Sequence, residues 1–304
     1  MKYALQVKDL TKNYKSASVL RGVNMNIPEG AIYGFVGKNG AGKTTLIRQI
    51  CGLQQPTSGS YSLWGIENTN SEIISSRKRM GAIVESPALY KSLTAYQNMK
   101  LQYMNLGLPN YDGIDDLLKL VGLGDTGRKK VKNFSLGMRQ RLAIAVALCG
   151  KPDFIILDEP INGLDPQGII EIRELILKLN REFKITILIS SHILDELSRI
   201  ATHYGFLDNG RIVREMTAEE LAHECRKSVR MKVSDTKVLS KIMEARGIEY
   251  KVIDDSTADV FSQLTFSEIA KAFADEGAEI ISMEEHDESL EAFYLSLIGG
   301  SNEK

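Results

Sequence analysis

The sequence predicts an α/β protein with a mainly parallel sheet flanked by helices, an antiparallel β subdomain, a helical insertion and a small α+β C-terminal domain. Two observations support this fold class. Short apolar segments such as residues 154–157 alternate with helical patterns such as residues 167–182, which is typical of a parallel sheet covered by helices. A glycine-rich loop at residues 37–45 also lies between an apolar segment and a helical pattern, the usual context of a phosphate-binding loop.

The loop matches the phosphate-binding (Walker A) pattern, in which glycines let the backbone turn tightly with its N–H groups pointing inward. An apolar run at residues 31–36 predicts a buried strand before the loop, and residues 46–50 predict a helix after it. The positive end of that helix would help to hold an oligophosphate. The residues expected to contact the nucleotide are Gly37, Asn39, Gly40, Ala41, Gly42, Lys43, Thr44 and Thr45.

Lys43 and Thr44 have the most specific roles in this loop. The Lys43 ammonium would reach the β- and γ-phosphates, and the Thr44 hydroxyl would bind Mg²⁺. The alternative is a chance glycine-rich turn, but the strand before the loop and the helix after it argue against that interpretation. The motif therefore predicts a P-loop NTPase core that binds a nucleoside triphosphate.

Composition indicates a soluble globular protein of about two domains. The chain of 304 residues is 43% hydrophobic and 25% charged, and its longest apolar run, residues 142–149, is too short to span a bilayer. Three scattered cysteines indicate neither a disulfide framework nor a zinc site, and they fit a reducing cytoplasm. Because Lys and Arg are not clustered with aromatic residues, we expect no nucleic-acid partner.

The distribution of charge predicts a domain boundary near residue 216. Residues 1–216 contain 28 Lys and Arg against 20 Asp and Glu, whereas residues 217–304 contain 10 against 19. The basic first part suits phosphate ligands. We therefore expect a nucleotide-binding domain at residues 1–216, with a helical subdomain at about 86–150, and an accessory domain at residues 217–304.

Further elements of the first part follow from apolar periodicity. Strands are expected at residues 3–7, 23–27, 60–64, 81–84, 154–157 and 185–189. Helical spacing between residues 86 and 132 predicts the insertion, and Ser135 is the expected N-cap of the apolar helix after it. Another helix is expected to begin at residues 190–192. The dipeptide at residues 209–210, Asn-Gly, predicts a two-residue hairpin.

The second part alternates short strands and helices. After a helix that follows residue 217, strands are expected at residues 229–233, 248–253, 259–264 and 280–283, and helices at residues 236–246, 267–275 and 289–297. The middle of this series is close to β-α-β-β-α-β, a ferredoxin-like order. This part contains no chemical motif, and its acidic residues are most simply a solvated surface.

Two adjacent carboxylates would complete the nucleotide site. The apolar strand at residues 154–157 leads into Asp158, which can hold Mg²⁺ through water from the end of the strand. Glu159 can accept a proton from a water that attacks the γ-phosphate. For this pair alone a solvated strand end is the alternative, but the phosphate-binding loop upstream favours the functional interpretation.

Taken together, these motifs resemble the ATP-binding-cassette (ABC) ATPases over about residues 3–215. Residues 134–138 occupy the place of the family signature, and residues 163–165 match the loop that crosses the family's dimer interface. The resemblance implies that Tyr14 stacks on adenine and that Asp158 is a metal ligand. The catalytic residues that it implies are Glu159, His192 and Lys43. It also implies ATP and Mg²⁺ as cofactors.

The resemblance further implies a head-to-tail dimer with ATP sandwiched between two copies of the chain. Ser135 and Gly137 lie at a helix start, so their donors face outward rather than into the helix. In the family this helix end meets the γ-phosphate held by the other subunit. Hydrolysis then releases the two copies, so the γ-phosphate acts as a removable link.

The sequence departs from the usual family pattern in two places. Leu136 and Met138 replace the usual Gly and Gln of the signature, and Glu85 replaces the usual Gln that contacts Mg²⁺. The signature variant, Glu85 and the acidic C-terminal extension are similar to the bacitracin-resistance and lantibiotic-immunity exporters. Either Glu85 adds a negative charge beside Mg²⁺, or it simply replaces Gln as an oxygen ligand.

The resemblance therefore implies the ATPase subunit of an exporter for peptide antibiotics or related compounds. Such a subunit would work with a separate membrane permease and lie in the cytoplasm, peripherally on the inner face of the membrane. The alternative is a soluble ABC ATPase that acts on ribosomes or DNA. A single phosphate-binding loop and the lack of a sustained heptad run argue against that alternative. A third possibility is a non-hydrolysing regulatory module, which the intact catalytic residues argue against.

Overall fold

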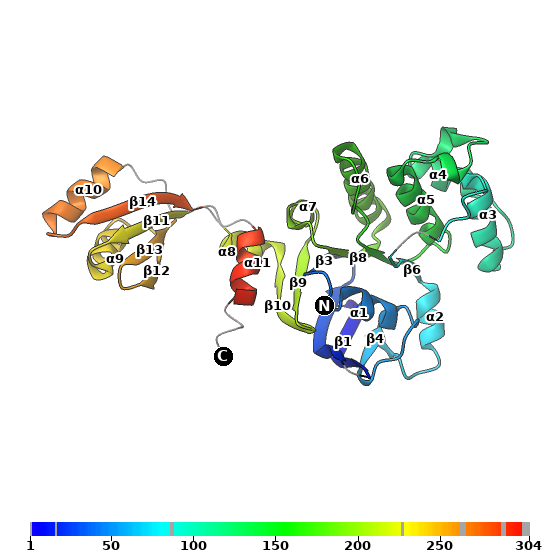
Figure 1. The fold of residues 1–304 in the computed structure, drawn as a ribbon, viewed down its shortest axis with the longest axis horizontal. Coiled ribbons are helices and arrows are strands. Elements are labelled where there is room, and N and C mark those ends of the chain that lie inside the picture. The colour runs from blue at the N-terminus through cyan, green and yellow to red at the C-terminus, as the bar shows by residue number, and fades with distance from the viewer. Residues whose placement is uncertain are drawn as a thin grey trace. The chain divides into compact units, whose positions relative to one another are not determined.

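The computed structural model describes residues 2–15, 17–85, 88–225, 228–261, 266–286 and 290–299. The chain forms two compact units, Met1–Ala218 and Glu219–Lys304 (Figure 1). Within the described part of the chain, no helix has the length and apolar character needed to cross a bilayer.

A six-stranded sheet forms the centre of the first unit, in the order β10-β9-β3-β8-β7-β6. Its strands are β3 (Ile32–Gly37), β6 (Met80–Ile83), β7 (Phe154–Asp158), β8 (Thr186–Ser191), β9 (His203–Asp208) and β10 (Arg211–Thr217). The strands from β9 to β6 run parallel, and only β10 is antiparallel to its neighbour. The strands β3, β7 and β8 are buried along their whole length, and each contains a run of apolar residues.

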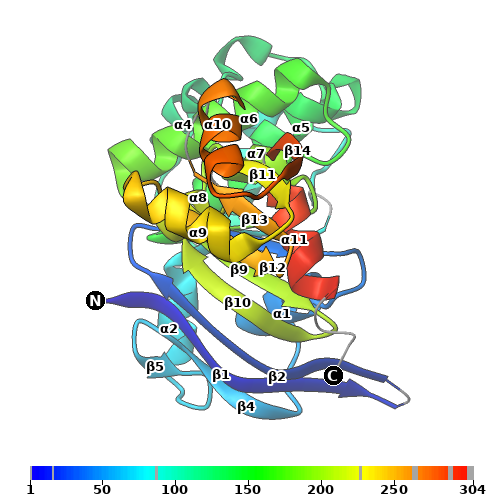
Figure 2. The same ribbon diagram turned by 90° about the vertical axis from the view of Figure 1, so that its left-hand side faces the viewer.

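An antiparallel sheet, in the order β2-β1-β4-β5, forms the second layer of this unit (Figure 2). Its strands are β1 (Tyr3–Tyr14), β2 (Ala17–Pro28), β4 (Ser58–Leu63) and β5 (Ile66–Glu67). Apolar residues of this sheet share one core with residues of β3 and of the helix after the phosphate-binding loop, including Val23, Phe35 and Leu46. The observed layers confirm the predicted α/β class with an antiparallel subdomain.

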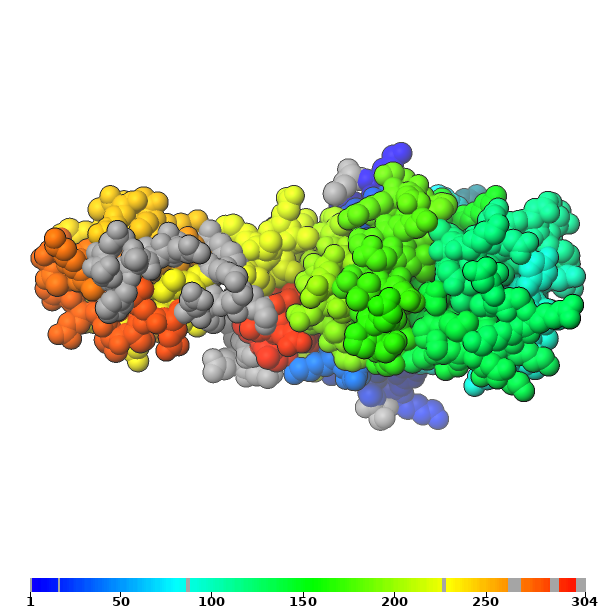
Figure 3. Space-filling model, turned by 90° about the horizontal axis from the view of Figure 1, so that it is seen from above, coloured from blue at the N-terminus to red at the C-terminus, as the bar shows by residue number. Residues whose placement is uncertain are grey.

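Helices surround the central sheet and form the predicted insertion. Outside the insertion lie α1 (Lys43–Ile50), α2 (Ile73–Lys78), α6 (Pro166–Phe183) and α7 (Leu194–Ser198). The insertion contains α3 (Ala95–Asn105), α4 (Ile114–Leu120), the 3₁₀ turns η1 (Gly124–Thr126) and η2 (Val131–Asn133), and α5 (Leu136–Leu148). Figure 3 shows α6 beside the insertion on one face of the molecule. Arg141 of α5 forms an ion pair of 3.4 Å with Glu171 of α6.

A buried tyrosine joins the two sheets just before the phosphate-binding loop. Tyr33 of β3 donates a hydrogen bond of 2.7 Å to Glu215 of β10, and the same carboxylate oxygen accepts one of 2.9 Å from the backbone N–H of Asn26 in β2. A Cβ at Gly205 would lie only 2.1 Å from the Tyr33 hydroxyl, so glycine is required beneath this ring. Burial, reinforced by the Glu215 carboxylate, raises the pKa of Tyr33 well above its usual value, which keeps the phenol a neutral donor.

The second unit has a ferredoxin-like topology. Its elements are β11 (Ser228–Val233), α9 (Thr236–Ala245), β12 (Tyr250–Asp254), β13 (Thr257–Val260), α10 (Phe266–Asp275) and β14 (Ile280–His286), flanked by α8 (Ala218–Glu224) and α11 (Leu290–Gly299). The sheet is antiparallel, in the order β12-β13-β11-β14. Leu239 of α9 and Phe273 of α10 pack in one core with Met231 of β11, so both helices cover the same face of the sheet.

Several element boundaries differ from the sequence prediction, and contacts in the structure explain two of these differences. Ser190 and Ser191 belong to β8 and pair with β3, so the next helix begins only at Leu194. The strand expected at residues 259–264 runs instead over Thr257–Val260, because Asp254 accepts a hydrogen bond from the backbone N–H of Ser256 in a tight turn. Residues 262–265 lie outside the described part of the chain.

Candidate functional site

The phosphate-binding loop links β3 to α1 and lines a cavity of about 190 Å³. Gly40 and Gly42 have φ angles of +81° and +113°, backbone conformations that residues other than glycine rarely adopt. A Cβ at Gly42 would also lie 2.8 Å from the Leu20 side chain, so the close approach of β2 requires glycine as well. The cavity is lined by Val19, Lys38, Asn39, Gly40, Gly42, Lys43, Thr44, Thr45 and Glu159.

Lys43 lines this cavity, and its side chain is only 6% exposed. Its ammonium donates hydrogen bonds to the backbone oxygens of Gly37, at 2.5 Å, and Lys38, at 3.4 Å. It also forms an ion pair of 3.4 Å with Glu159 Oε1. These contacts satisfy a charge that would otherwise be costly to bury, and they hold it beside the cavity.

Asp158 and Thr44 meet beside the lysine. Thr44 Oγ1 donates a hydrogen bond of 2.9 Å to Asp158 Oδ2, and Ser190 Oγ donates one of 2.5 Å to Asp158 Oδ1. Asp158 is buried at the end of β7, and Thr44 lies in the first turn of α1. A hydroxyl and a carboxylate in contact supply the oxygen ligands that Mg²⁺ prefers, so these two side chains fit a magnesium site.

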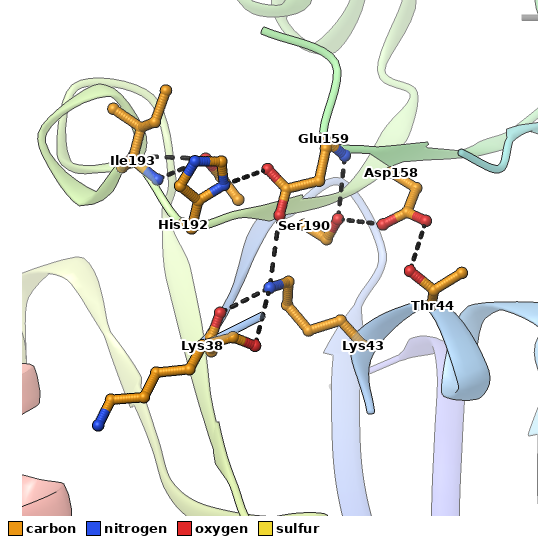
Figure 4. Close-up of polar contacts among 10 residues, drawn as sticks. Lys38, Lys43, Thr44, Asp158, Glu159, Ser190, His192 and Ile193 are labelled. Atoms are coloured by element: carbon orange, nitrogen blue, oxygen red, sulfur yellow. Dashed lines mark hydrogen bonds and ion pairs between the residues drawn. The ribbon is translucent and has the colours of Figure 1, made fainter. Parts of the chain in front are cut away.

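Glu159 has an unusual backbone conformation, with φ at +52°. Its N–H donates to two oxygens of Ser190, the backbone oxygen at 3.1 Å and Oγ at 3.0 Å, and these bonds hold the turn after β7. The Glu159 side chain faces Lys43 with one oxygen and lies 2.8 Å from His192 Nδ1 with the other (Figure 4). The structure thus brings Lys43, Glu159 and His192 together.

Ser190 is a site residue that the sequence analysis missed. Its hydroxyl donates to Asp158 while accepting from the Glu159 N–H, so one side chain holds both the Asp158 carboxylate and the backbone of Glu159. The only signal in the sequence is a polar residue at the end of an apolar strand, a position that is also typical of a helix start. The parallel register that places Ser190 opposite Asp158 is a long-range feature.

Tyr14 does not line the cavity. It lies at the end of β1, its side chain is 43% exposed, and its hydroxyl donates a hydrogen bond of 2.7 Å to Gln54. Ser135 and Gly137 also lie away from the cavity of their own chain, at the start of α5 in the insertion. Ser135 is the predicted N-cap, and its Oγ accepts a hydrogen bond of 3.2 Å from the Met138 N–H.

Glu85 is not in contact with the Thr44–Asp158 pair. It follows β6 with φ at +62°, and its Oε1 forms an ion pair of 2.7 Å with Arg48 of α1. The Glu85 side chain is 58% exposed. The structure therefore links this carboxylate to the helix that follows the phosphate-binding loop.

Comparisons with known proteins place the chain in a family. A family model described as ABC transporter matches residues 20–162. The bacitracin transport ATP-binding protein BcrA of Enterococcus faecalis is 40% identical over 306 residues, which cover 99% of this chain and 98% of that protein. The chain belongs to the ATP-binding proteins of ABC transporters. The lantibiotic transport ATP-binding protein SrtF of Streptococcus pyogenes is 46% identical over 211 residues, which cover 69% of this chain and 90% of that protein.

Solved structures confirm the predicted cassette fold. CbiO1 from Clostridium perfringens, part of the ABC transporter complex cbiONQ, is 30% identical with a TM-score of 0.67, over 80% of this chain and 96% of that one. The cassette MJ0796, solved as a dimer in a post-hydrolysis state with ADP and phosphate, is 28% identical with a TM-score of 0.64, over 70% of this chain and 98% of that one. This ABC protein is an ATPase, the ATP-binding subunit of a transporter.

Proposed function

We propose that this ABC ATPase drives the export of peptide antibiotics of the bacitracin or lantibiotic class through a separate membrane permease. The observation that supports this class best is the 40% identity to BcrA, which extends over 99% of the chain and therefore includes the second unit. The match to SrtF covers 69% of the chain at higher identity and supports the same class of substrate. CbiO1, as part of a transporter complex, supports a permease partner and a position on the cytoplasmic face of the membrane.

In this proposal the residues around the cavity divide the work of ATP binding. Lys43 turns from Glu159 toward the β- and γ-phosphates, because a phosphate in the cavity competes with the carboxylate for the ammonium. Thr44 and Asp158 hold Mg²⁺ with their adjacent oxygens. The metal, when bound, neutralises charge on the phosphates. The N–H groups of the loop and of the first turn of α1 face the same phosphates.

Glu159 is the proposed general base. Once Lys43 turns to the phosphates, the Glu159 carboxylate is free to accept the proton of the attacking water. His192 keeps that carboxylate oriented through the contact at Nδ1, and the Ser190 hydrogen bonds fix the backbone that presents it. The fixed geometry matters, because a base that is displaced by about 1 Å can lose 10²-fold in rate.

A second copy of the chain completes the proposed site. Ser135 and Gly137 do not line the cavity of their own chain. Ser135 lies at the start of α5 with an exposed polar side chain, which could therefore contact another copy of the chain. The dimeric state of the cassette MJ0796 supports their contact with ATP held by the partner copy. In the same dimer, Tyr14 of each copy stacks on the adenine of its own ATP.

Growth in the presence of antibiotic tests the substrate class. Co-expressed with a membrane permease that co-purifies with it, the wild-type chain should raise the bacitracin or lantibiotic concentration that stops growth of a sensitive bacterium. The same pair with Glu159→Gln is the control, and we expect no protection from it. If the wild-type pair protects against neither class while the purified chain hydrolyses ATP, the proposed substrate class is wrong.

Glu85→Gln tests whether the extra charge acts on the metal. Gln keeps the side-chain oxygen but removes the negative charge. We therefore expect the Mg²⁺ concentration for half-maximal ATPase activity to rise by about two- to fivefold, which corresponds to the usual interaction energy of an exposed charge. Arg48→Gln is the matched control, since it removes the partner of Glu85 and should lower that concentration. Identical Mg²⁺ titrations of wild type and Glu85→Gln would show that the charge of Glu85 does not act on the metal.

A further inference from the structure

An ion pair joins α6, the helix that follows Glu159 in the chain, to α7, the helix that follows His192. Arg173 Nη1 of α6 lies 2.9 Å from Glu196 Oε2 of α7, and the two side chains are only 18% and 20% exposed. A pair that is mostly shielded from water interacts more strongly than one on the surface. This contact connects elements that follow two different strands of the central sheet, β7 and β8.

The helix that follows His192 depends on such contacts for its position. The helix α7 has five residues, and its N-cap, Ile193, makes no side-chain cap hydrogen bond. A helix of this length is not stable by itself, so tertiary contacts must hold it. Among the residues that the structure describes, the ion pair with Arg173 is the charged contact that links α7 to another element.

The same ion pair packs against the segment that follows Glu159. A cavity of about 10 Å³ lies between these elements, which leaves the junction nearly fully packed. Its walls are formed by Pro160, Ile161, Arg173, Ile176, Ile189, Glu196, Leu197 and Ile200. Pro160 directly follows Glu159, so Arg173 lies at the junction between the segment that presents Glu159 and the helix that follows His192.

We propose that Arg173 is a positioning residue that keeps His192 within hydrogen-bond distance of Glu159. The proposal rests on the roles proposed above for these two residues, and it adds a residue that touches neither ATP nor the reacting water. If the ion pair is broken, α7 can shift relative to α6, and the 2.8 Å contact between His192 Nδ1 and Glu159 Oε2 lengthens. Glu159 then loses the group that orients it, while the cavity around Lys43 and Thr44 is unchanged.

Arg173→Met tests this role, because Met keeps the length of the stem and removes the charge. We expect kcat for ATP hydrolysis to fall roughly tenfold, with the dissociation constant for ATP within about twofold of wild type. The ring resonance of His192 in NMR spectra, assigned with His192→Gln, should move toward its position in Glu159→Ala, in which the contact is removed. Arg173→Lys, which retains the charge, should recover part of the lost kcat.

Arg199→Met is the matched control. Arg199 lies on the other side of Glu196, at 3.9 Å from its second oxygen, but it is 60% exposed and contacts Glu196 only from the end of the same helix. We expect its kcat and its His192 resonance to equal those of wild type. A large loss of kcat in Arg199→Met would mean that the charge of Glu196, rather than the link between helices, is what matters.

Unchanged kcat and an unchanged His192 resonance in folded Arg173→Met would overturn the proposal. Should Arg173→Met fail to fold, Glu196→Gln breaks the same pair with almost no change of shape, and the same two readouts then decide. Glu159→Gln separates this proposal from the one on which it rests. If Glu159→Gln retains wild-type kcat, the role of Glu159 is wrong; if it is inactive while Arg173→Met is fully active, only the role of Arg173 is wrong.

Discussion

Glu159→Gln is expected to lower kcat for ATP hydrolysis by about 100-fold or more, the usual contribution of a general base. The amide keeps the shape of the side chain and can still contact His192, but it cannot accept a proton from water. ATP binding should be preserved, because Lys43, Thr44 and Asp158 are unchanged. Phosphate release measured at saturating ATP reports kcat, and titration with a fluorescent ATP analogue reports binding.

Glu182→Gln is the matched control for this variant. It makes the same chemical change at an exposed position near the end of α6, and we expect wild-type turnover from it. A Glu159→Gln protein that hydrolyses ATP within tenfold of the wild-type rate would show that another group accepts the proton.

Lys43→Ala is expected to weaken nucleotide binding by about 10- to 100-fold, which corresponds to the loss of one or more hydrogen bonds from a charged donor. The Lys43 side chain lines the cavity and is only 6% exposed, so its charge is mostly shielded from water and interacts strongly with a bound phosphate. The defect should lie in binding itself, in contrast to Glu159→Gln. Equilibrium titration with ATP, without hydrolysis, measures it directly.

Lys178→Ala provides the comparison, because it removes an exposed lysine from α6, away from the cavity. Its affinity for ATP should be that of wild type. If Lys43→Ala binds ATP as tightly as Lys178→Ala does, the loop holds phosphate through its backbone alone, and the role of the ammonium has to be revised.

The sequence predicted those parts of the fold and site that local patterns determine. The strands β3, β7 and β8 are buried along their length, and each contains an apolar run that is recognisable in the sequence. The phosphate-binding loop directly follows β3, and its glycines, Lys43 and Thr44 have the fixed spacing of the motif. Asp158 and Glu159 were predicted for the same reason, because they directly follow a recognisable strand.

Contacts between distant segments could not be predicted in this way. Ser190 meets Asp158 because of the parallel register of β7 and β8, which no local pattern specifies. The ion pair of Arg48 with Glu85 joins residues 37 positions apart, and neither residue by itself indicates the other. In the second unit the order of elements was predictable, but the start of β13 depends on the turn at Asp254.

The central claim is that a second copy of the chain completes each ATP site. It is tested most directly by the mass of the Glu159→Gln protein in solution, measured by light scattering with and without Mg²⁺ and ATP. This variant should bind ATP without hydrolysing it, so the sandwich of two copies should accumulate. We predict the mass of a monomer without nucleotide and twice that mass with Mg²⁺ and ATP. A mass that stays at the monomer value, under conditions in which titration shows ATP bound, would contradict a site completed by a second copy of the chain.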